Sequence, residues 1–231
     1  KKNTFLFKII LLIFFLFVIY NGVYAKTSDK YNKSENISGY FSGILSIYNN
    51  EYLNSFKYFK QLEGLENTHL FYSQLYLHTL INLKKFDKAF AFAKKIEKKN
   101  PNDFQSNLII GVYHFKNKRY EKALKNFEKL NDENQKDALK NLLALSLKGW
   151  SDFPNTTKNE ALNYLATLPK QYNNIAEIQK AFVNCFHDSE NTEQEFIKLT
   201  SNEKIDFSRY IFFLTNYLNN SSKHKVAIDY L

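Results

Sequence analysis

The chain is poor in the residues that build reactive or ligand-cradling loops. Of 231 residues only one is a cysteine, so no disulfide can form within the chain. That residue, Cys185, lies in an apolar run, where a small buried side chain is expected rather than a reactive thiol. Only six glycines are present, too few for a glycine-rich loop around a phosphate group. These shortages disfavour disulfide scaffolds, thiol enzymes and nucleotide-binding proteins.

Catalytic and metal-binding patterns are also missing. No two histidines stand three or four residues apart, the spacing that would place two metal ligands on one helix face. No serine-hydrolase elbow and no cysteine–histidine signature occurs. We therefore predict no catalytic residues, no metal site and no cofactor, and a protein that is not an enzyme. Scattered residues can still assemble into a site, so this alternative stays open.

The net charge of +9 raises the question of nucleic acid or anionic lipid as a partner. The lysines are scattered, as in the pairs Lys94-Lys95 and Lys98-Lys99, and acidic residues lie among them. This pattern is typical of a solvated surface. We therefore expect no nucleic-acid partner, and a basic nucleic-acid or anionic-glycan binder is kept only as a less favoured alternative.

The first 25 residues resemble a bacterial secretory signal peptide. Lys1, Lys2 and Lys8 precede an apolar run from residue 9 to 20, and small side chains at Val23 and Ala25 suit a signal peptidase. The apolar run is shorter than the roughly 20 residues that a membrane span needs. We expect cleavage after Ala25, a flexible lead-in over residues 26–35, and export to the periplasm or cell envelope. The alternative is an uncleaved segment that anchors the protein in the inner membrane, the only membrane contact that we expect.

The main signal is an internal repeat. Segments 52–62, 86–96 and 120–130 match at aromatic, small, apolar and apolar positions, and each begins 34 residues after the previous one. Within each segment the matched positions are three, four and three residues apart, so they share one face of a helix.

A second apolar-periodic stretch precedes each of these segments, over residues 39–48, 71–83 and 104–115. Short polar breaks at 49–51, 84–85 and 117–119 separate the two stretches. Each unit is therefore predicted to be a helix, a tight turn and a second helix.

In period and pattern the chain resembles the tetratricopeptide repeat family. The resemblance implies an all-α, right-handed superhelical solenoid of antiparallel helix hairpins. It also implies close approach of small residues between paired helices, namely Gly43 with Ser55 and Gly111 with Ala123. Leu77, opposite Ala89, departs from that pattern, and the family's tryptophan near the start of the first helix is missing throughout. In layout and composition the chain further resembles exported tetratricopeptide proteins of alphaproteobacteria.

The repeat suggests how the chain is divided. Three repeats are expected over residues 36–69, 70–103 and 104–137, and a degenerate fourth over 138–173, with a long turn from Gly149 to Thr157. Further helical hairpins are expected over 174–231, and they are expected to continue beyond the chain end in a longer protein.

The family resemblance implies a partner-binding groove lined by the first helix of each repeat. The implied residues are Ile37, Tyr40, Ile44, Ile47, Phe71, Gln74, His78, Ile81, Gln105, Leu108, Val112 and Phe115. Some tetratricopeptide modules clamp a C-terminal carboxylate with cationic residues, but the matching positions here are Tyr40, Ile44, Leu75, Gln105 and Ile109, none of which is a cation.

The lining is apolar and aromatic, which favours an apolar or amphipathic protein or peptide segment. Individual residues of the set can equally pack against neighbouring helices. The sequence thus predicts a non-catalytic scaffold for protein–protein interaction in the bacterial cell envelope. The first alternative is a membrane-anchored assembly factor.

Overall fold

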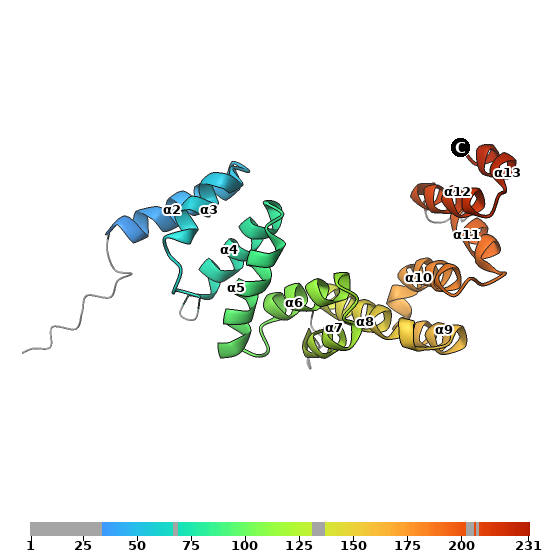
Figure 1. Cartoon of the computed structure of the whole chain (residues 1–231), viewed down its shortest axis with the longest axis horizontal. Coiled ribbons are helices and arrows are strands. Elements are labelled where there is room, and N and C mark those ends of the chain that lie inside the picture. Colours follow the sequence, from blue (N-terminus) through green and yellow to red (C-terminus); the bar gives the residue numbers. More distant parts are fainter. Residues whose placement is uncertain (1–33, 67–68, 131–136, 202–205, 207) are drawn as a thin grey trace, which may run out of the picture. The chain divides into compact units, whose positions relative to one another are not determined.

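The computed structural model describes residues 34–66, 69–130, 137–201, 206 and 208–231. Over these residues the chain forms α-helices and short 3₁₀ turns without any β-strand, which confirms the predicted all-α class (Figure 1). The predicted signal peptide, residues 1–25, lies outside the described part. The predicted lead-in over 26–35 is too long, because helix α2 already begins at Ser34.

The helices form consecutive pairs. The first helices of the pairs are α2 (Ser34–Tyr48), α4 (Leu70–Asn82), α6 (Phe104–Lys116), α8 (Ala138–Asp152), α10 (Asn173–Phe186) and α12 (Ile211–Asn220). The second helices are α3 (Tyr52–Lys60), α5 (Phe86–Lys99), α7 (Tyr120–Phe127), α9 (Lys158–Ala166), α11 (Thr192–Thr200) and α13 (His224–Asp229). Short 3₁₀ turns occur at Glu128–Leu130, Phe153–Asn155, Lys170–Tyr172 and Ser208–Tyr210.

Five of the pairs share one turn geometry. The turn residue has a left-handed backbone with φ between 48° and 60° at Asn50, Lys84, Lys118, Asp188 and Ser222. In each turn the next residue donates its N–H to the carbonyl five positions back, at 2.7–2.9 Å. This is the Schellman ending, which satisfies carbonyl groups that the helix leaves unpaired. The turns at 50, 84 and 118 are 34 residues apart, as are those at 188 and 222, so the repeat period recurs in the backbone.

The fourth pair turns differently. Helix α8 continues to Asp152, four residues into the segment predicted as a turn, and a 3₁₀ turn follows. Helix α9 then starts with a capping box, in which the Thr157 side chain accepts from the Glu160 N–H and the Glu160 carboxylate accepts from the Thr157 N–H. The Tyr164 hydroxyl donates to the Leu145 carbonyl oxygen at 2.7 Å and ties α9 to α8.

The described part of the chain divides into two compact units, one ending at Phe92 and one beginning at Ala93. In the first unit the core is aromatic. The ring of Phe59, fully buried, lies 5.8 Å from that of Tyr72 and 6.3 Å from that of Tyr76. The Tyr72 hydroxyl donates to the Phe59 carbonyl oxygen, which joins α4 to α3. These contacts fix α4 against the preceding hairpin.

The predicted small-to-small contacts of the hairpins need a correction. A Cβ added to Gly43 would lie 2.5 Å from the ring of Phe59, and one added to Gly111 would overlap the ring of Phe127. Each ring comes from the residue one helical turn beyond the expected partner, Ser55 or Ala123. The glycines therefore make room for a buried aromatic ring of the second helix rather than for another small residue.

The described residues of the second unit form three apolar clusters along the chain. Phe127 and Ala144 belong to the first, Phe153 and Leu165 to the second, and Phe196 with Leu214 and Leu218 to the third. In the fourth pair, the apolar residues Ala161, Leu165 and Leu168 are buried. Because each cluster joins neighbouring pairs, the first helices keep one face outside these clusters, and that face holds the candidate site.

Candidate functional site

In the first unit all eight predicted groove residues remain accessible to solvent. Phe71, Gln74, His78 and Ile81 on α4 are exposed, as is Ile37 on α2, whereas Tyr40, Ile44 and Ile47 are half-buried. Helix α2 packs against α4, and the rings of Tyr40 and His69 lie 4.9 Å apart across that contact. The structure therefore places the predicted residues of the first unit on two helices that contact each other.

The half-buried Tyr40 side chain also contributes to helix packing. Its ring contacts His69, whose Nδ1 accepts the Tyr72 N–H and caps the start of α4. Partial burial raises the pKa of the Tyr40 hydroxyl. Loss of this side chain would therefore disturb the α2–α4 contact, whereas Phe71, which is 54% exposed, can be removed with less effect on packing.

In the second unit the predicted set lies on α6. Val112 is 45% exposed, and Gln105, Leu108 and Phe115 are half-buried. Leu108 and Phe115 pack against the cluster that contains Phe127, so they serve the core at least in part. Of the four, Val112 presents the most open apolar surface.

The sequence analysis missed a strip of aromatic residues on α8, α10 and α12, the first helices of the last three pairs. The ring of Trp150 on α8 lies 6.4 Å from that of Phe186 on α10, and the ring of Phe182, one helical turn earlier, lies 4.9 Å from that of Phe213 on α12. Phe186 and Phe213 are exposed. The groove prediction stopped at the third repeat because the register of the later repeats is hard to read. The aromatic residues of these first helices were the signal available in the sequence.

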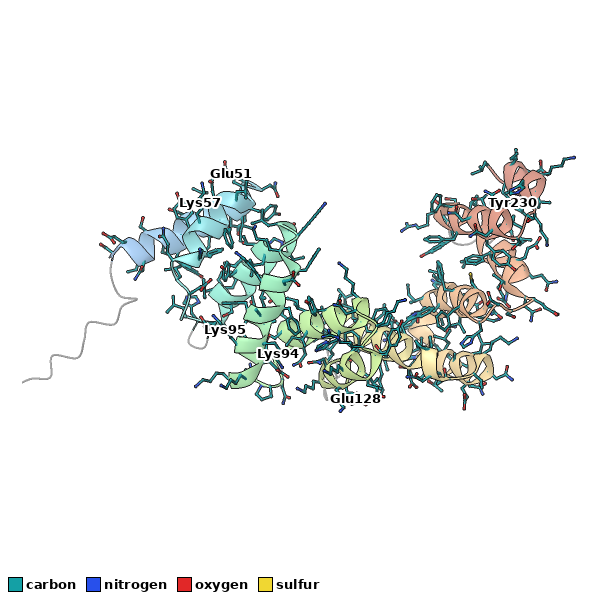
Figure 2. The ribbon with its side chains drawn as sticks, in the orientation of Figure 1. Glu51, Lys57, Lys94, Lys95, Glu128 and Tyr230 are labelled. Carbon is teal, nitrogen blue, oxygen red and sulfur yellow. The ribbon has the colours of Figure 1, made fainter. Side chains whose placement is uncertain are left out.

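The first helices are also short of charge. Helix α4 has no Asp, Glu, Lys or Arg in 13 residues, α12 has none in ten, and α2 has only Glu35. In contrast, α5 has five lysines, of which Lys94 and Lys95 are labelled in Figure 2. Charge is therefore concentrated on the second helices, and the accessible faces of α2 and α4 are nearly neutral.

Several lysines, on second helices and elsewhere, form ion pairs with carboxylates. Glu97 accepts from Lys94 at 2.5 Å and from Lys129 at 2.8 Å. Partial burial by itself raises the pKa of the Glu97 carboxyl, but the two ammonium groups outweigh it, and the pKa lies below its usual value. Lys180 and Lys198 pair with Glu195 and Glu177 in the same way. The basic surface is thus partly neutralised by local pairs.

The described residues show no assembled reactive centre. They contain no group of three or more His, Cys, Asp or Glu side chains placed to hold a metal ion. Burial, and secondarily Asp188, raises the pKa of the Cys185 thiol, the reverse of the lowered pKa of a nucleophilic cysteine. Burial, with Lys122, Arg119 and Lys94, lowers the pKa of His114. In the described segments no helix has the length and apolar character needed to cross a membrane.

Solved structures of other proteins share this arrangement of helices. The chain is similar to MamA, residues 41 to the end, from Desulfovibrio magneticus RS-1, with a TM-score of 0.58 and 17% identity over 74% of this chain and 97% of that one. It is also similar to the apo form of RapI, with a TM-score of 0.52 and 15% identity over 89% of this chain and 83% of that one. Both are helical-repeat proteins of the tetratricopeptide type. The fold is tetratricopeptide-like.

At these identities the likeness concerns the fold alone. No family model matches the sequence, and neither does any curated protein. The assignment of the fold therefore rests on the helix pairs, their common turn and the two solved structures. The function has to be argued from the accessible faces of this chain.

Proposed function

We propose that the protein is a non-catalytic scaffold that binds an uncharged apolar or amphipathic protein segment on its first helices. The observation that supports this most is the separation of charge between first and second helices. Interface centres are depleted in charged residues, because burying an unpaired charge is costly. The near-neutral faces of α2 and α4 fit this requirement, and the lysine-rich α5 does not.

The first unit offers the clearest part of the groove. Phe71 and Ile81 lie on α4 with exposed fractions of 54% and 37%, and the half-buried Ile44 belongs to the neighbouring α2. Fully burying such a side chain from water is worth about 1.5–3 kcal/mol, so these partly exposed ones can each contribute about 1 kcal/mol when a partner covers them. The groove of this proposal therefore consists of the α2 and α4 residues predicted from the sequence, with the aromatic strip of the second unit as a separate apolar surface.

The location belongs to the same proposal. The apolar run of residues 9–20 with Val23 and Ala25 supports export to the periplasm or cell envelope after cleavage. N-terminal sequencing of the protein recovered from bacteria tests this directly. A mature chain that starts at Lys26 is expected, whereas a chain that retains residues 1–25 would favour the membrane-anchored assembly factor.

A pair of matched variants tests the groove. The double variant Phe71→Ala, Ile81→Ala removes exposed apolar surface from α4, and the control Leu53→Ala, Phe86→Ala removes similar surface from the second helices α3 and α5. Proteins captured from cell-envelope extract are compared by mass spectrometry, and the affinity of the main captured protein is then measured. The groove variant should bind at least about tenfold more weakly, a loss of roughly 1.4 kcal/mol or more, while the control binds as the unmodified protein does.

The salt dependence of binding distinguishes this proposal from binding that is driven by charge. Binding to a neutral face should change little as the salt concentration rises, whereas binding of nucleic acid or an anionic glycan through lysines should weaken steeply. Equal losses in the groove variant and the control, or steep salt dependence, would contradict the proposed groove. Circular dichroism of both variants verifies that the helices remain intact.

A further inference from the structure

Helix α2 carries a second accessible face beside its groove residues. Ile37, Phe41, Leu45 and Tyr48 follow one another at spacings of four, four and three, so they form one row along the helix. Their exposed fractions are 54%, 62%, 61% and 81%. We call these four residues the α2 row. Ile37 also belongs to the predicted groove, whereas the other three do not.

The α2 row results from an unusual orientation of the helix. An amphipathic helix normally buries its large apolar side chains. The buried residues of α2 are instead Gly39, Gly43 and Ser46, and the ring of Phe59 from α3 fills the space next to Gly43. Because small residues face the core, the large apolar residues of the α2 row, on the opposite side of the helix, point to solvent. Such a row of exposed apolar residues is typical of an interface.

The charge of the surroundings limits what can cover the row. Helix α2 has no lysine or arginine, and its only carboxylate is Glu35 in the first turn. The whole chain has a net charge of +9, so two copies repel each other over most of their surface. The α2 row is a place where two copies can meet without bringing lysines together. Because α2 itself carries no cation, the row gives no local attraction to an anionic membrane surface.

The order of side chains in the row is self-complementary. Read in either direction, aliphatic and aromatic side chains alternate: Ile37, Phe41, Leu45, Tyr48. If two α2 helices pack antiparallel across a two-fold axis, Ile37 meets Tyr48 of the other copy and Phe41 meets Leu45. Every contact then joins one aliphatic and one aromatic side chain, and the helix dipoles oppose each other favourably.

We propose that the α2 row is a homodimer interface, in which α2 of one copy packs antiparallel on α2 of a second copy. This inference goes beyond the proposed groove, because Phe41, Leu45 and Tyr48 lie outside the groove set. Dimer formation would place two copies of the groove, apart from Ile37, on one assembly. A partner with two binding segments would then be held more tightly than by a single copy.

The size of the row indicates a weak, reversible dimer. Side chains of about 150–250 Å² each, exposed by half or more, supply roughly 400–500 Å² per copy. The total of about 800–1,000 Å² lies below the roughly 1,200–2,000 Å² of stable specific interfaces, in the range of weak, transient ones. We therefore expect a dissociation constant of roughly 10–100 μM, and a mixture of monomer and dimer across that concentration range.

The test uses the full chain and sedimentation velocity over a concentration series that spans this range. The unmodified protein should shift from monomer to dimer, and F41E and L45K should each remain monomeric, since each places a charge against an apolar side chain twice in the dimer. Leu53→Glu, a change of an equally exposed residue on α3, should dimerise normally. Far-ultraviolet circular dichroism shows whether each variant keeps its helices.

Mixing the variants tests the antiparallel register. In a mixed dimer of F41E with L45K, the new glutamate faces the new lysine and the remaining pair, Leu45 with Phe41, is unmodified, so dimers should return. A mixture of F41E with F41K should stay monomeric, because residue 41 does not face itself. A monomeric unmodified protein, or a dimer insensitive to F41E, would overturn the proposal. So would folded variants that fail to pair when F41E and L45K are mixed.

Discussion

Two glycines one turn apart on α2 should respond in opposite ways to the same substitution. Gly39 and Gly43 are both inside the helix, so replacement by alanine improves helix propensity at either position by about 1 kcal/mol. A Cβ added at Gly39 has no neighbouring atom within 4 Å. A Cβ added at Gly43 lies 2.5 Å from the ring of Phe59. Any difference between the two variants therefore reports the contact with that ring.

The size of the effect follows from how firmly Phe59 is held. Two carbon atoms pack at roughly 3.5–4.0 Å, so the Gly43→Ala variant must open the α2–α3 contact by about 1 Å. Phe59 is fully buried, with the rings of Tyr40, Tyr72 and Tyr76 around it, and so has little room to yield. Overpacking of this kind costs about 1–3 kcal/mol.

Chemical denaturation followed by circular dichroism measures both variants. Gly39→Ala should raise the free energy of unfolding by up to about 1 kcal/mol. Gly43→Ala should lie about 1–3 kcal/mol below Gly39→Ala, because the gain in propensity cancels in the comparison. Equal stabilities would refute the close approach of Phe59 to Gly43 and the pairing of α2 with α3 in this register.

Two further predictions concern a turn and a buried hydroxyl. Lys118→Gly should raise the free energy of unfolding by about 0.5–1 kcal/mol, because glycine adopts the left-handed turn without steric cost. Lys116→Gly, at the last helical residue of α6, should instead lower it slightly, and denaturation curves of both variants decide this. Burial, and then Asp152, raises the pKa of Tyr164 to about 12, so the stability that its neutral hydroxyl provides should persist below pH 10 and decline as the pH rises towards 12. Tyr164→Phe should lose about 1 kcal/mol at neutral pH and no longer show that decline; an unchanged alkaline profile would contradict the assignment.

The local structure of the hairpins follows from the sequence. The polar breaks at 49–51, 84–85 and 117–119 coincide with turns at Asn50, Lys84 and Lys118, because apolar periodicity and its interruption are properties of a few adjacent residues. The same holds for the helical class of the whole described chain. Where the pattern was irregular, as from Gly149 to Asp152, local signals failed and the helix proved longer.

The candidate site was predictable only in part. The apolar character of the first helices can be read directly from their composition, and the predicted α4 residues are exposed. Whether Leu108 or Phe115 faces a partner or the core depends on a cluster assembled from α6, α7 and α8. The α2 row was also missed, since a periodic apolar pattern does not say which face of a helix is buried.

The sequence by itself determined that this chain forms helical hairpins, where most of them turn and which helices are free of charge, because spacing, turn residues and composition act locally. Tertiary structure decided which residues of each helix reach solvent. Phe59 and Phe127 pack onto Gly43 and Gly111, because a planar ring fits where a side chain is missing. With Phe59 packed on Gly43, α2 is oriented so that Phe41 and Leu45 face outward. No pattern along the chain specifies this orientation.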